Sequence, residues 1–390
     1  MNTTTTTTGR SYRPYFWDEF TSAPAPRGDG GQSLPAWAER GLRSLRDGLG
    51  REPGSVPSMR QLHRVRPTDA DRNADRLPAS YRAEHAVLTL FGLHQTGAAH
   101  SAHRPGVGLG TACRGLRGSL SEAAVRRRLA AAATAQDLDE LVQHLRGIVP
   151  LLRQADTGLD YTRLYRDLCD WLTPRHTKVL RAWGLQYTDP TGAPAETRAD
   201  GPQGAKPRTA DQPLWATFDP KSGSAGADLA ALRSGLGAEA GTVPAMWRFY
   251  RTSLSTELRA KGALTRDLVA EHTALALFGV HQHGRRVPMH THGVSPGAAC
   301  HRLLARDGQA DRTAIERRLG VLLTSLDGEE LAHHLRGLVT LLRAKDIGLD
   351  YDALRRALRH WDDSEGAEEQ SRIRSRWDRD FRVGDAPPRD

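Results

Sequence analysis

The sequence has little cysteine and no long apolar run. Its three cysteines, Cys113, Cys169 and Cys300, are too few and too scattered for a disulfide framework. We therefore expect a protein of the reducing cytosol, with a cytoplasmic location. No run of 18 apolar residues occurs, which excludes a transmembrane helix. Residues 1–10 are a threonine tract without an apolar centre, so we expect no secretory signal there.

Lysine is also scarce. Only five of the 55 basic residues are lysine, and the net charge is +9. Codon bias explains many arginines, but guanidinium groups also suit phosphate binding and base stacking. Residues 1–187 hold 26 basic and 18 acidic residues, whereas residues 213–390 hold 26 and 24. The charge favours an anionic partner, and we expect the two halves of the chain to contact that partner unequally.

Three blocks of the sequence occur twice. LRSLRDGLGREPGSVPSM matches LAALRSGLGAEAGTVPAM at 11 of 18 positions, and EHAVLTLFGLHQTG matches EHTALALFGVHQHG at nine of 14. Residues 127–161 match residues 317–351 at 20 of 35 positions. A unit of this length that occurs twice is a duplicated domain rather than a solenoid repeat.

A segment rich in proline and glycine, residues 188–212, separates the two copies and is predicted to be a flexible linker. We predict a first domain over residues 15–187 and a second over residues 213–383. The remaining ends, residues 1–14 and 384–390, are predicted to be tails, the first of them disordered.

Apolar residues follow a helical period in both copies. In the third block of the first copy they recur at steps of three and four, at Leu138, Leu141, Val142, Leu145, Val149 and Leu152. Thr134 or Asp137 is placed to cap that helix. We find no alternating segment longer than four residues that would indicate a strand. The sequence therefore predicts an all-α fold, with two tandem helical bundles.

Arginines recur at equivalent positions of the two copies. A solvated helix face is one explanation, and a surface that follows nucleic-acid phosphates is the other. The presence of these arginines in both copies, while neighbouring polar positions differ, favours the phosphate-binding surface. The candidates for nucleic-acid binding are Arg127, Arg128, Arg146, Arg153, Arg317, Arg318, Arg336 and Arg343.

Other motifs are weaker indications of chemistry. The loop RPGVGLGTA could offer backbone amides to a phosphate, but no strand precedes it and no Gly-Lys-Ser/Thr follows. Glu84 next to His85, repeated as Glu271 next to His272, could be an acid/base pair. Adjacent helical residues point in different directions, however. A carboxylate at the start of a helix, where the helix dipole favours it, is enough to explain the repeated glutamate.

Histidine is abundant in the second copy, where His281, His283, His290 and His292 precede Cys300. Two His-x-His pairs could bind zinc, but the first copy keeps few of these residues, and no Cys-x-x-Cys or His-Glu-x-x-His occurs. No nucleophile elbow, serine triad or magnesium-type carboxylate cluster is found either. We therefore expect no metal site, no cofactor and no catalytic residue, and the sequence favours binding over catalysis.

The repeated blocks resemble the CasB family, the small subunit of the type I-E CRISPR surveillance complex (Cascade). The resemblance is carried by GLG…G-x-VP-x-M, EH-x-x-L-x-LFG-x-HQ, HRPGVGLG and RRL…HLRG-[IL]-V-x-LLR…GLDY. A closing Trp-x-x-x-[YF] also fits, at Trp183 and Trp377. These motifs cover nearly all of both copies and leave out the tails and the linker.

The resemblance implies an all-helical, non-enzymatic protein. Members of the family contact the crRNA-bound backbone subunits and the large subunit, and a basic surface holds the displaced strand of the R-loop. A fused double unit implies that one chain supplies both small-subunit positions. By the same resemblance, the eight arginines are the expected contacts with that strand.

The two copies depart from each other in one aromatic motif. The second has MWRFY at residues 246–250, as the family usually does, whereas the first has MRQLH at residues 59–63. Equal DNA binding by both copies is therefore in doubt. Two alternatives stay open: a protein-interaction scaffold that does not bind DNA, and a metal-dependent hydrolase that uses the histidines of the second copy.

Overall fold

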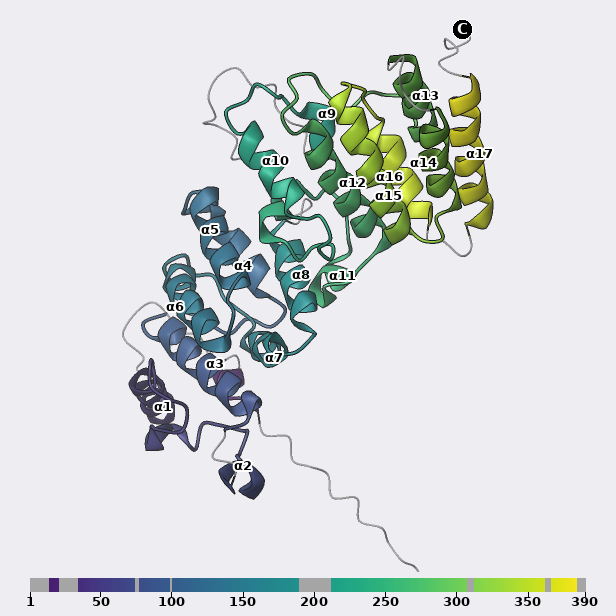
Figure 1. The fold of residues 1–390 in the computed structure, drawn as a ribbon. Coiled ribbons are helices and arrows are strands. Elements are labelled where there is room, and N and C mark those ends of the chain that lie inside the picture. Colours follow the sequence, from purple (N-terminus) through teal and green to yellow (C-terminus); the bar gives the residue numbers. More distant parts are fainter. Residues whose placement is uncertain are drawn as a thin grey trace, which may run out of the picture. The chain divides into compact units, whose positions relative to one another are not determined.

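The computed structural model is helical throughout its described part (Figure 1). The described residues are 14–20, 34–73, 77–98, 100–188, 212–306, 312–361 and 366–383. Within these ranges extended backbone pairs at two isolated bridges, between His103 and Leu159 and between His290 and Leu349. The predicted all-α fold is confirmed. No helix in the described ranges is long and apolar enough to cross a membrane.

The first copy folds into helices that follow the repeated blocks of the sequence. They are η1 (Asp18–Phe20), α1 (Ala36–Asp47), η2 (Pro57–Met59), α2 (Asp69–Asn73), α3 (Ala79–Gln95), α4 (Leu109–Gly115), η3 (Leu116–Gly118), α5 (Glu122–Ala133), α6 (Leu138–Gln154), α7 (Tyr161–Trp171) and α8 (His176–Tyr187).

The second copy repeats this order, so that α12 corresponds to α3 and α17 corresponds to α8. Its helices are α9 (Leu214–Thr217), α10 (Ala225–Arg233), η5 (Pro244–Phe249), α11 (Thr256–Lys261), α12 (Arg266–Gln282), α13 (Pro296–Arg306), α14 (Arg312–Thr324), α15 (Gly328–Ala344), α16 (Tyr351–Trp361) and α17 (Ala367–Val383).

The chain forms two compact units, Met1–Val179 and Leu180–Asp390. The boundary falls inside α8, so residues 180–187 belong to the second unit although the repeat assigns them to the first copy. The domain bounds expected from the sequence, 15–187 and 213–383, rest on the repeat alone and stay a prediction.

One helix lies at the centre of each unit, α3 in the first and α12 in the second. Helix α3 contacts α1, α6 and α7, and α12 contacts their equivalents α10, α15 and α16. Both helices are buried on nearly every side. This explains why their sequence is apolar all round rather than on one stripe.

The repeated carboxylates Glu84 and Glu271 are completely buried in these central helices. Glu271 accepts hydrogen bonds from the amides of Arg251 (2.7 Å) and Thr252 (2.9 Å), and Glu84 accepts two amides in the same way. Both carboxylates lie in the second turn of their helix, so the expectation of a helix-start carboxylate was wrong. They hold the chain segment that follows η2 or η5, because buried amides need an acceptor.

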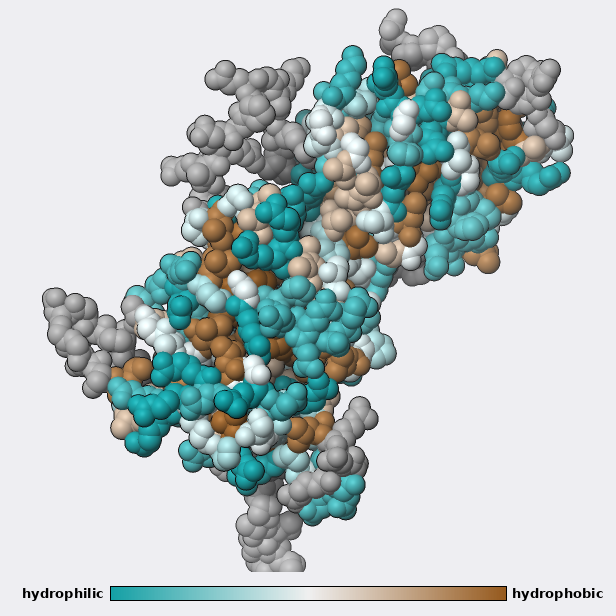
Figure 2. Space-filling view, turned by 60° about the vertical axis from the view of Figure 1, so that its left-hand side comes forward, coloured by the Kyte–Doolittle hydropathy of each residue, from teal (hydrophilic) through white to brown (hydrophobic). Residues whose placement is uncertain are grey.

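The surface of the described residues is mixed in character. Figure 2 shows hydrophilic side chains over much of one face, with apolar side chains interspersed among them. An interface for an anionic partner must therefore be located from the charged side chains themselves.

Candidate nucleic-acid interface

Four of the eight predicted arginines are exposed on equivalent helices. Arg127 and Arg128 lie on α5, and Arg317 and Arg318 lie on α14. Arg128 contacts the carbonyl one turn earlier at 3.4 Å, and Arg318 does the same at 3.5 Å. Contacts of this length along a solvated helix leave both guanidinium groups accessible to an anion.

Arg153 and Arg343 have a different environment. Arg153 on α6 is half-buried, and its Nη1 donates to the carbonyls of Leu93 (3.2 Å) and Thr96 (3.3 Å) at the end of α3. Arg343 on α15 donates in the same way to Val280 near the end of α12 (3.3 Å). The last carbonyls of a helix lack partners within it. Capping of the central helix therefore accounts for the presence of this arginine in both copies.

The other predicted pair, Arg146 and Arg336, by contrast differs between the copies. Arg146 is half-buried, lies next to Gly50 and is 3.4 Å from Oε1 of Gln143. Its equivalent Arg336 is exposed and lines a hollow of ≈ 580 Å³ with His333. The structure thus does not give Arg146 and Arg336 one common environment.

A second set of basic side chains, absent from the sequence prediction, lines a groove between α16 and α17. We call it the α16–α17 groove; its volume is ≈ 680 Å³. Its charged and titratable lining residues are Arg356, His360, Glu369, Arg372, Arg376 and Arg379. Four arginines face a single carboxylate, so the groove is strongly basic.

Most of this charge is not neutralised by neighbours. Arg372 pairs with Glu368 (3.3 Å) and Glu369 (3.5 Å) on its own helix. Within the described ranges, Arg356, Arg376 and Arg379 are exposed and form no ion pair. Three uncompensated guanidinium groups in one groove suit the phosphates of a polyanion.

Helical periodicity explains why the arginines gather there. Helix α17 buries Ile373, Trp377 and Phe381, which places positions 372, 376 and 379 together on another face. Helix α16 buries Leu354 and Leu358 and likewise leaves positions 356 and 360 one turn apart at the surface. A search for arginines at steps of three and four beside these apolar residues would have found the basic face of each helix.

The first copy does not repeat this groove. When Trp171 is aligned with Trp361, Arg356 keeps an arginine but His360 becomes Asp170. When Trp183 is aligned with Trp377, Arg376 and Arg379 become Ala182 and Leu185, both of them buried. The groove is thus a property of the second copy.

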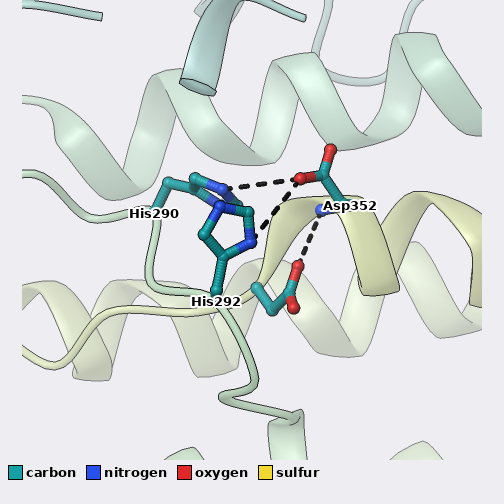
Figure 3. A group of neighbouring side chains, drawn as sticks. His290, His292 and Asp352 are labelled. Atoms are coloured by element: carbon teal, nitrogen blue, oxygen red, sulfur yellow. Dashed lines mark hydrogen bonds and ion pairs between the residues drawn. The ribbon is translucent and has the colours of Figure 1, made fainter. Parts of the chain in front are cut away.

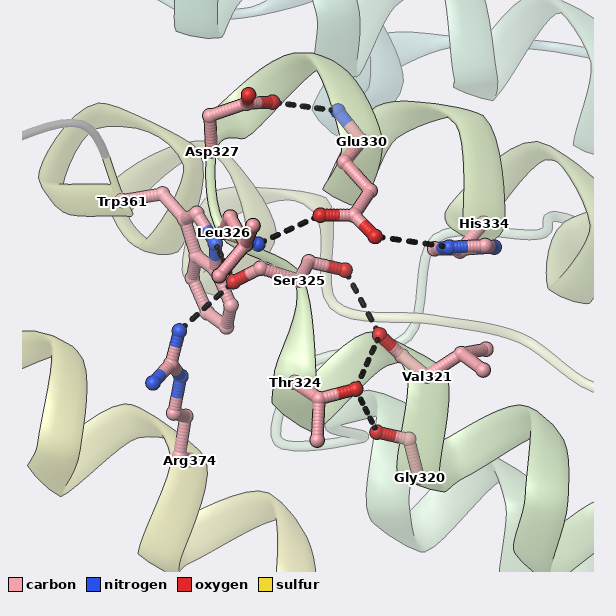
Figure 4. Close-up of polar contacts among 10 residues, drawn as sticks. All are labelled: Gly320, Val321, Thr324, Ser325, Leu326, Asp327, Glu330, His334, Trp361 and Arg374. Atoms are coloured by element: carbon pink, nitrogen blue, oxygen red, sulfur yellow. Dashed lines mark hydrogen bonds and ion pairs between the residues drawn. The ribbon is translucent and has the colours of Figure 1, made fainter.

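The two walls of the groove share one anchor, the carbonyl of Ser325 between α14 and α15. It accepts Nε1 of Trp361 on α16 (3.2 Å) and Nη2 of Arg374 on α17 (2.8 Å), as Figure 4 shows. The Arg374 guanidinium also lies 5.0 Å from the centroid of the Trp361 ring. The first copy has Leu180 at the position of Arg374, so the contact from α17 to this carbonyl is specific to the second copy.

The histidines of the second copy form one cluster that could hold a metal ion. The ligand atoms of His290, His292, Asp350 and Asp352 lie within 4.8 Å of one another (Figure 3). However, Nδ1 of His290 accepts the amide of Tyr351 at 3.2 Å, so in the neutral ring Nε2 carries the proton. That N–H points to the Asp352 carboxylate at 3.6 Å. In this tautomer neither ring nitrogen of His290 presents a free lone pair to a metal.

Of the other candidates, His281 and Cys300 are buried within the fold, whereas His283 is exposed. Burial lowers the pKa of His281 to about 4, and its ring contacts Tyr351 Oη (3.0 Å) and the Ile347 carbonyl (2.9 Å). Burial raises the pKa of the Cys300 thiol to about 12. A buried thiol that stays protonated is a poor nucleophile and a poor ligand.

The glycine loop is also satisfied within the fold. The Gly106 amide donates to Oδ2 of Asp160 (2.8 Å), and Gly293 donates to Asp350 at the same distance. Both glycines have positive φ, +84° and +77°, as a tight turn requires. These amides are already bonded, so the loop does not offer them to a phosphate.

Comparison with known proteins gives one family. The family model described as CRISPR-associated protein Cse2 matches residues 42–187 and again residues 228–381. Among solved structures, the crystal structure of CasB from Thermobifida fusca is similar at 28% sequence identity. The match covers 41% of this chain and 86% of that one, with a TM-score of 0.32. No curated protein matches the chain.

Proposed function

The chain belongs to the Cse2 family and carries two Cse2 units in tandem, and from this we propose that it is the non-catalytic small subunit of a type I-E Cascade complex. One chain supplies both small-subunit positions in the cytoplasm. Its partners are the crRNA-bound backbone subunits, the large subunit and the target DNA in the R-loop. Its basic surfaces bind the displaced non-target strand and thereby support antiviral defence.

The observation that carries the proposal is the charge of the α16–α17 groove. Arg356, Arg376 and Arg379 form no ion pair among the described residues, and a polyanion can supply the counter-charge. The exposed arginines Arg127 and Arg317, each followed by a second arginine, offer further phosphate contacts.

Binding of this kind has a clear mechanical consequence. R-loop formation exchanges a DNA duplex for a hybrid of similar stability, so a small protein contribution decides the balance. Contacts with phosphates hold the displaced strand without reading its sequence and oppose its return to the complementary strand. The chain thus needs no reacting group, which agrees with the contacts of His281 and His290 within the fold and with the burial of Cys300.

The test is the salt dependence of strand retention in the assembled complex. We expect the triple variant Arg356→Gln, Arg376→Gln, Arg379→Gln to release the displaced strand faster. Removal of three phosphate contacts should reduce the slope of log affinity against log salt by about 2 for single-stranded DNA.

A matched control removes the same charge elsewhere. Arg82, Arg312 and Arg382 already pair with carboxylates, and their triple Gln variant should leave the slope nearly unchanged. If both variants behave like the unmodified protein at physiological salt, while assembly is intact, the groove does not bind the strand, and the alternative of a protein-interaction scaffold gains.

A further inference from the structure

The end of α8 is an integral part of the second unit. Residues 180–187 precede the linker in the sequence, yet they belong to that unit. Leu180, Ala182, Trp183 and Leu185 are all buried, so this part of α8 is enclosed on more than one face. We call residues 180–187 the docking segment.

A buried arginine fixes the docking segment. The Arg181 side chain is 5% exposed, and its guanidinium binds three acceptors. Nε donates to the Ala240 carbonyl (2.9 Å), Nη1 to the Gly262 carbonyl (2.8 Å), and Nη2 to the Glu239 carboxylate. A buried charge is stable only when it is paired and hydrogen-bonded in this way.

A glycine lets the docking segment approach an aromatic ring. A Cβ at Gly184 would lie 2.3 Å from Nε1 of Trp247 and within 2.6 Å of two more ring atoms. Trp247 cannot easily move away, because it is buried and its Nε1 donates to the Gly241 carbonyl (2.8 Å). We call Glu239, Ala240, Gly241, Trp247 and Gly262 the docking site.

The second copy has no such docking segment of its own. When Trp183 is aligned with Trp377, Arg181 becomes Ser375 and Gly184 becomes Asp378. Ser375 is exposed, and Asp378 pairs with Arg382 at 2.9 Å. Helix α17 therefore lacks both the arginine and the glycine that α8 uses.

The first copy, conversely, has no such docking site. Arg60 replaces Trp247 and is exposed. The equivalent of Gly241 is Gly54, and a Cβ there would meet Leu77 and Tyr81 of the first copy itself. Trp247, one of the aromatic residues that distinguish the second copy, thus belongs to a site that receives a helix.

From these contacts we propose that the docking site is specific for the closing helix of a Cse2 unit that carries arginine and glycine three residues apart. In this chain the docking segment occupies the site. The arrangement is used once, because α17 lacks the arginine and the glycine of the docking segment and the first copy lacks the docking site. The linker is then not what keeps the closing helix in place. This inference goes beyond strand binding and does not depend on it.

The experiment uses the full chain with a protease site inserted in residues 188–212. After cleavage, the fragments are followed by gel filtration with light scattering. We expect them to stay together, and we expect the uncleaved chain to remain monomeric as its concentration is raised. Excess peptide of residues 174–188 should release the amino-terminal fragment in proportion to its concentration.

Two variants sharpen the test. Arg181→Ala and Gly184→Leu should each weaken the association of the cleaved fragments by about tenfold or more. The first variant loses the charged hydrogen bonds, and the second places a side chain where α8 approaches Trp247. Ser375→Ala, the equivalent change in α17, should have no effect. Separation of the cleaved unmodified fragments, or self-assembly of the intact chain, would overturn the proposal without bearing on DNA binding.

Discussion

Replacement of Arg153 or Arg343 by alanine separates a structural role from a DNA-binding one. Arg153 makes two hydrogen bonds to the last carbonyls of α3, whereas Arg343 makes one to α12. Both side chains are only half-buried, and the distances of 3.2–3.3 Å are long for such bonds. We therefore expect losses in the free energy of unfolding of about 1–3 kcal/mol for Arg153→Ala and about 1 kcal/mol for Arg343→Ala.

The assay has two readouts. Urea unfolding followed by circular dichroism gives the stability, and binding of single-stranded DNA at fixed salt gives the affinity of the folded protein. Strand affinity should change less than about twofold, since the guanidinium group already has partners in the fold. Arg153→Lys keeps the charge but loses the planar fork, so it should stay destabilised.

The opposite pattern would refute this reasoning. Unchanged unfolding together with a tenfold loss of strand affinity in Arg153→Ala, restored by Arg153→Lys, would show that the arginine acts as a surface charge. The sequence prediction for this residue would then hold, and the helix-capping contacts would be incidental.

Two further predictions concern stability. Burial lowers the pKa of His94 and of His281 to about 4, so each ring favours the folded state while it is neutral; the stability should be complete above pH ~6.5 and fall as the pH drops from there toward 4. Thermal unfolding across that range checks this, and a flat profile would contradict it. Gly297→Ala should destabilise by about 1–3 kcal/mol, because its Cβ would lie 1.8 Å from the backbone oxygen of Trp377. Gly320→Ala, in open space on α14, should instead stabilise by about 0.5–1 kcal/mol, and equal effects of the two changes in urea unfolding would contradict the packing argument.

The fold was predictable because burial repeats with the helical period. In α6, the apolar positions read from the sequence, such as Leu141, Leu145 and Leu152, are the buried ones. Asp137, expected as a possible cap, accepts the Glu140 amide at 2.8 Å. Such features depend on neighbours within one or two turns, which a sequence displays directly.

The candidate site was less predictable because it depends on neighbours distant in the sequence. Whether Arg153 faces solvent or the end of α3 is decided by the packing of α6 on α3, some 60 residues away. Repetition in both copies did not distinguish the two roles, since a helix cap repeats as faithfully as a binding residue. The lining of the α16–α17 groove is likewise visible only once the two helices lie side by side.

The net charge of each half of the chain did not indicate where the basic groove lies. In the sequence the first half of the chain carries the larger excess of basic over acidic residues. The groove with three arginines that form no ion pair among the described residues nevertheless lies in the second half. At physiological salt a charge acts over about 8 Å, so a phosphate responds to the guanidinium groups next to it and not to the sum over a domain. Arginines spread over a surface and paired with carboxylates, like Arg82 with Asp139, add to the sum without adding a site. Arg356, Arg376 and Arg379 add little to the sum, but they converge on one groove.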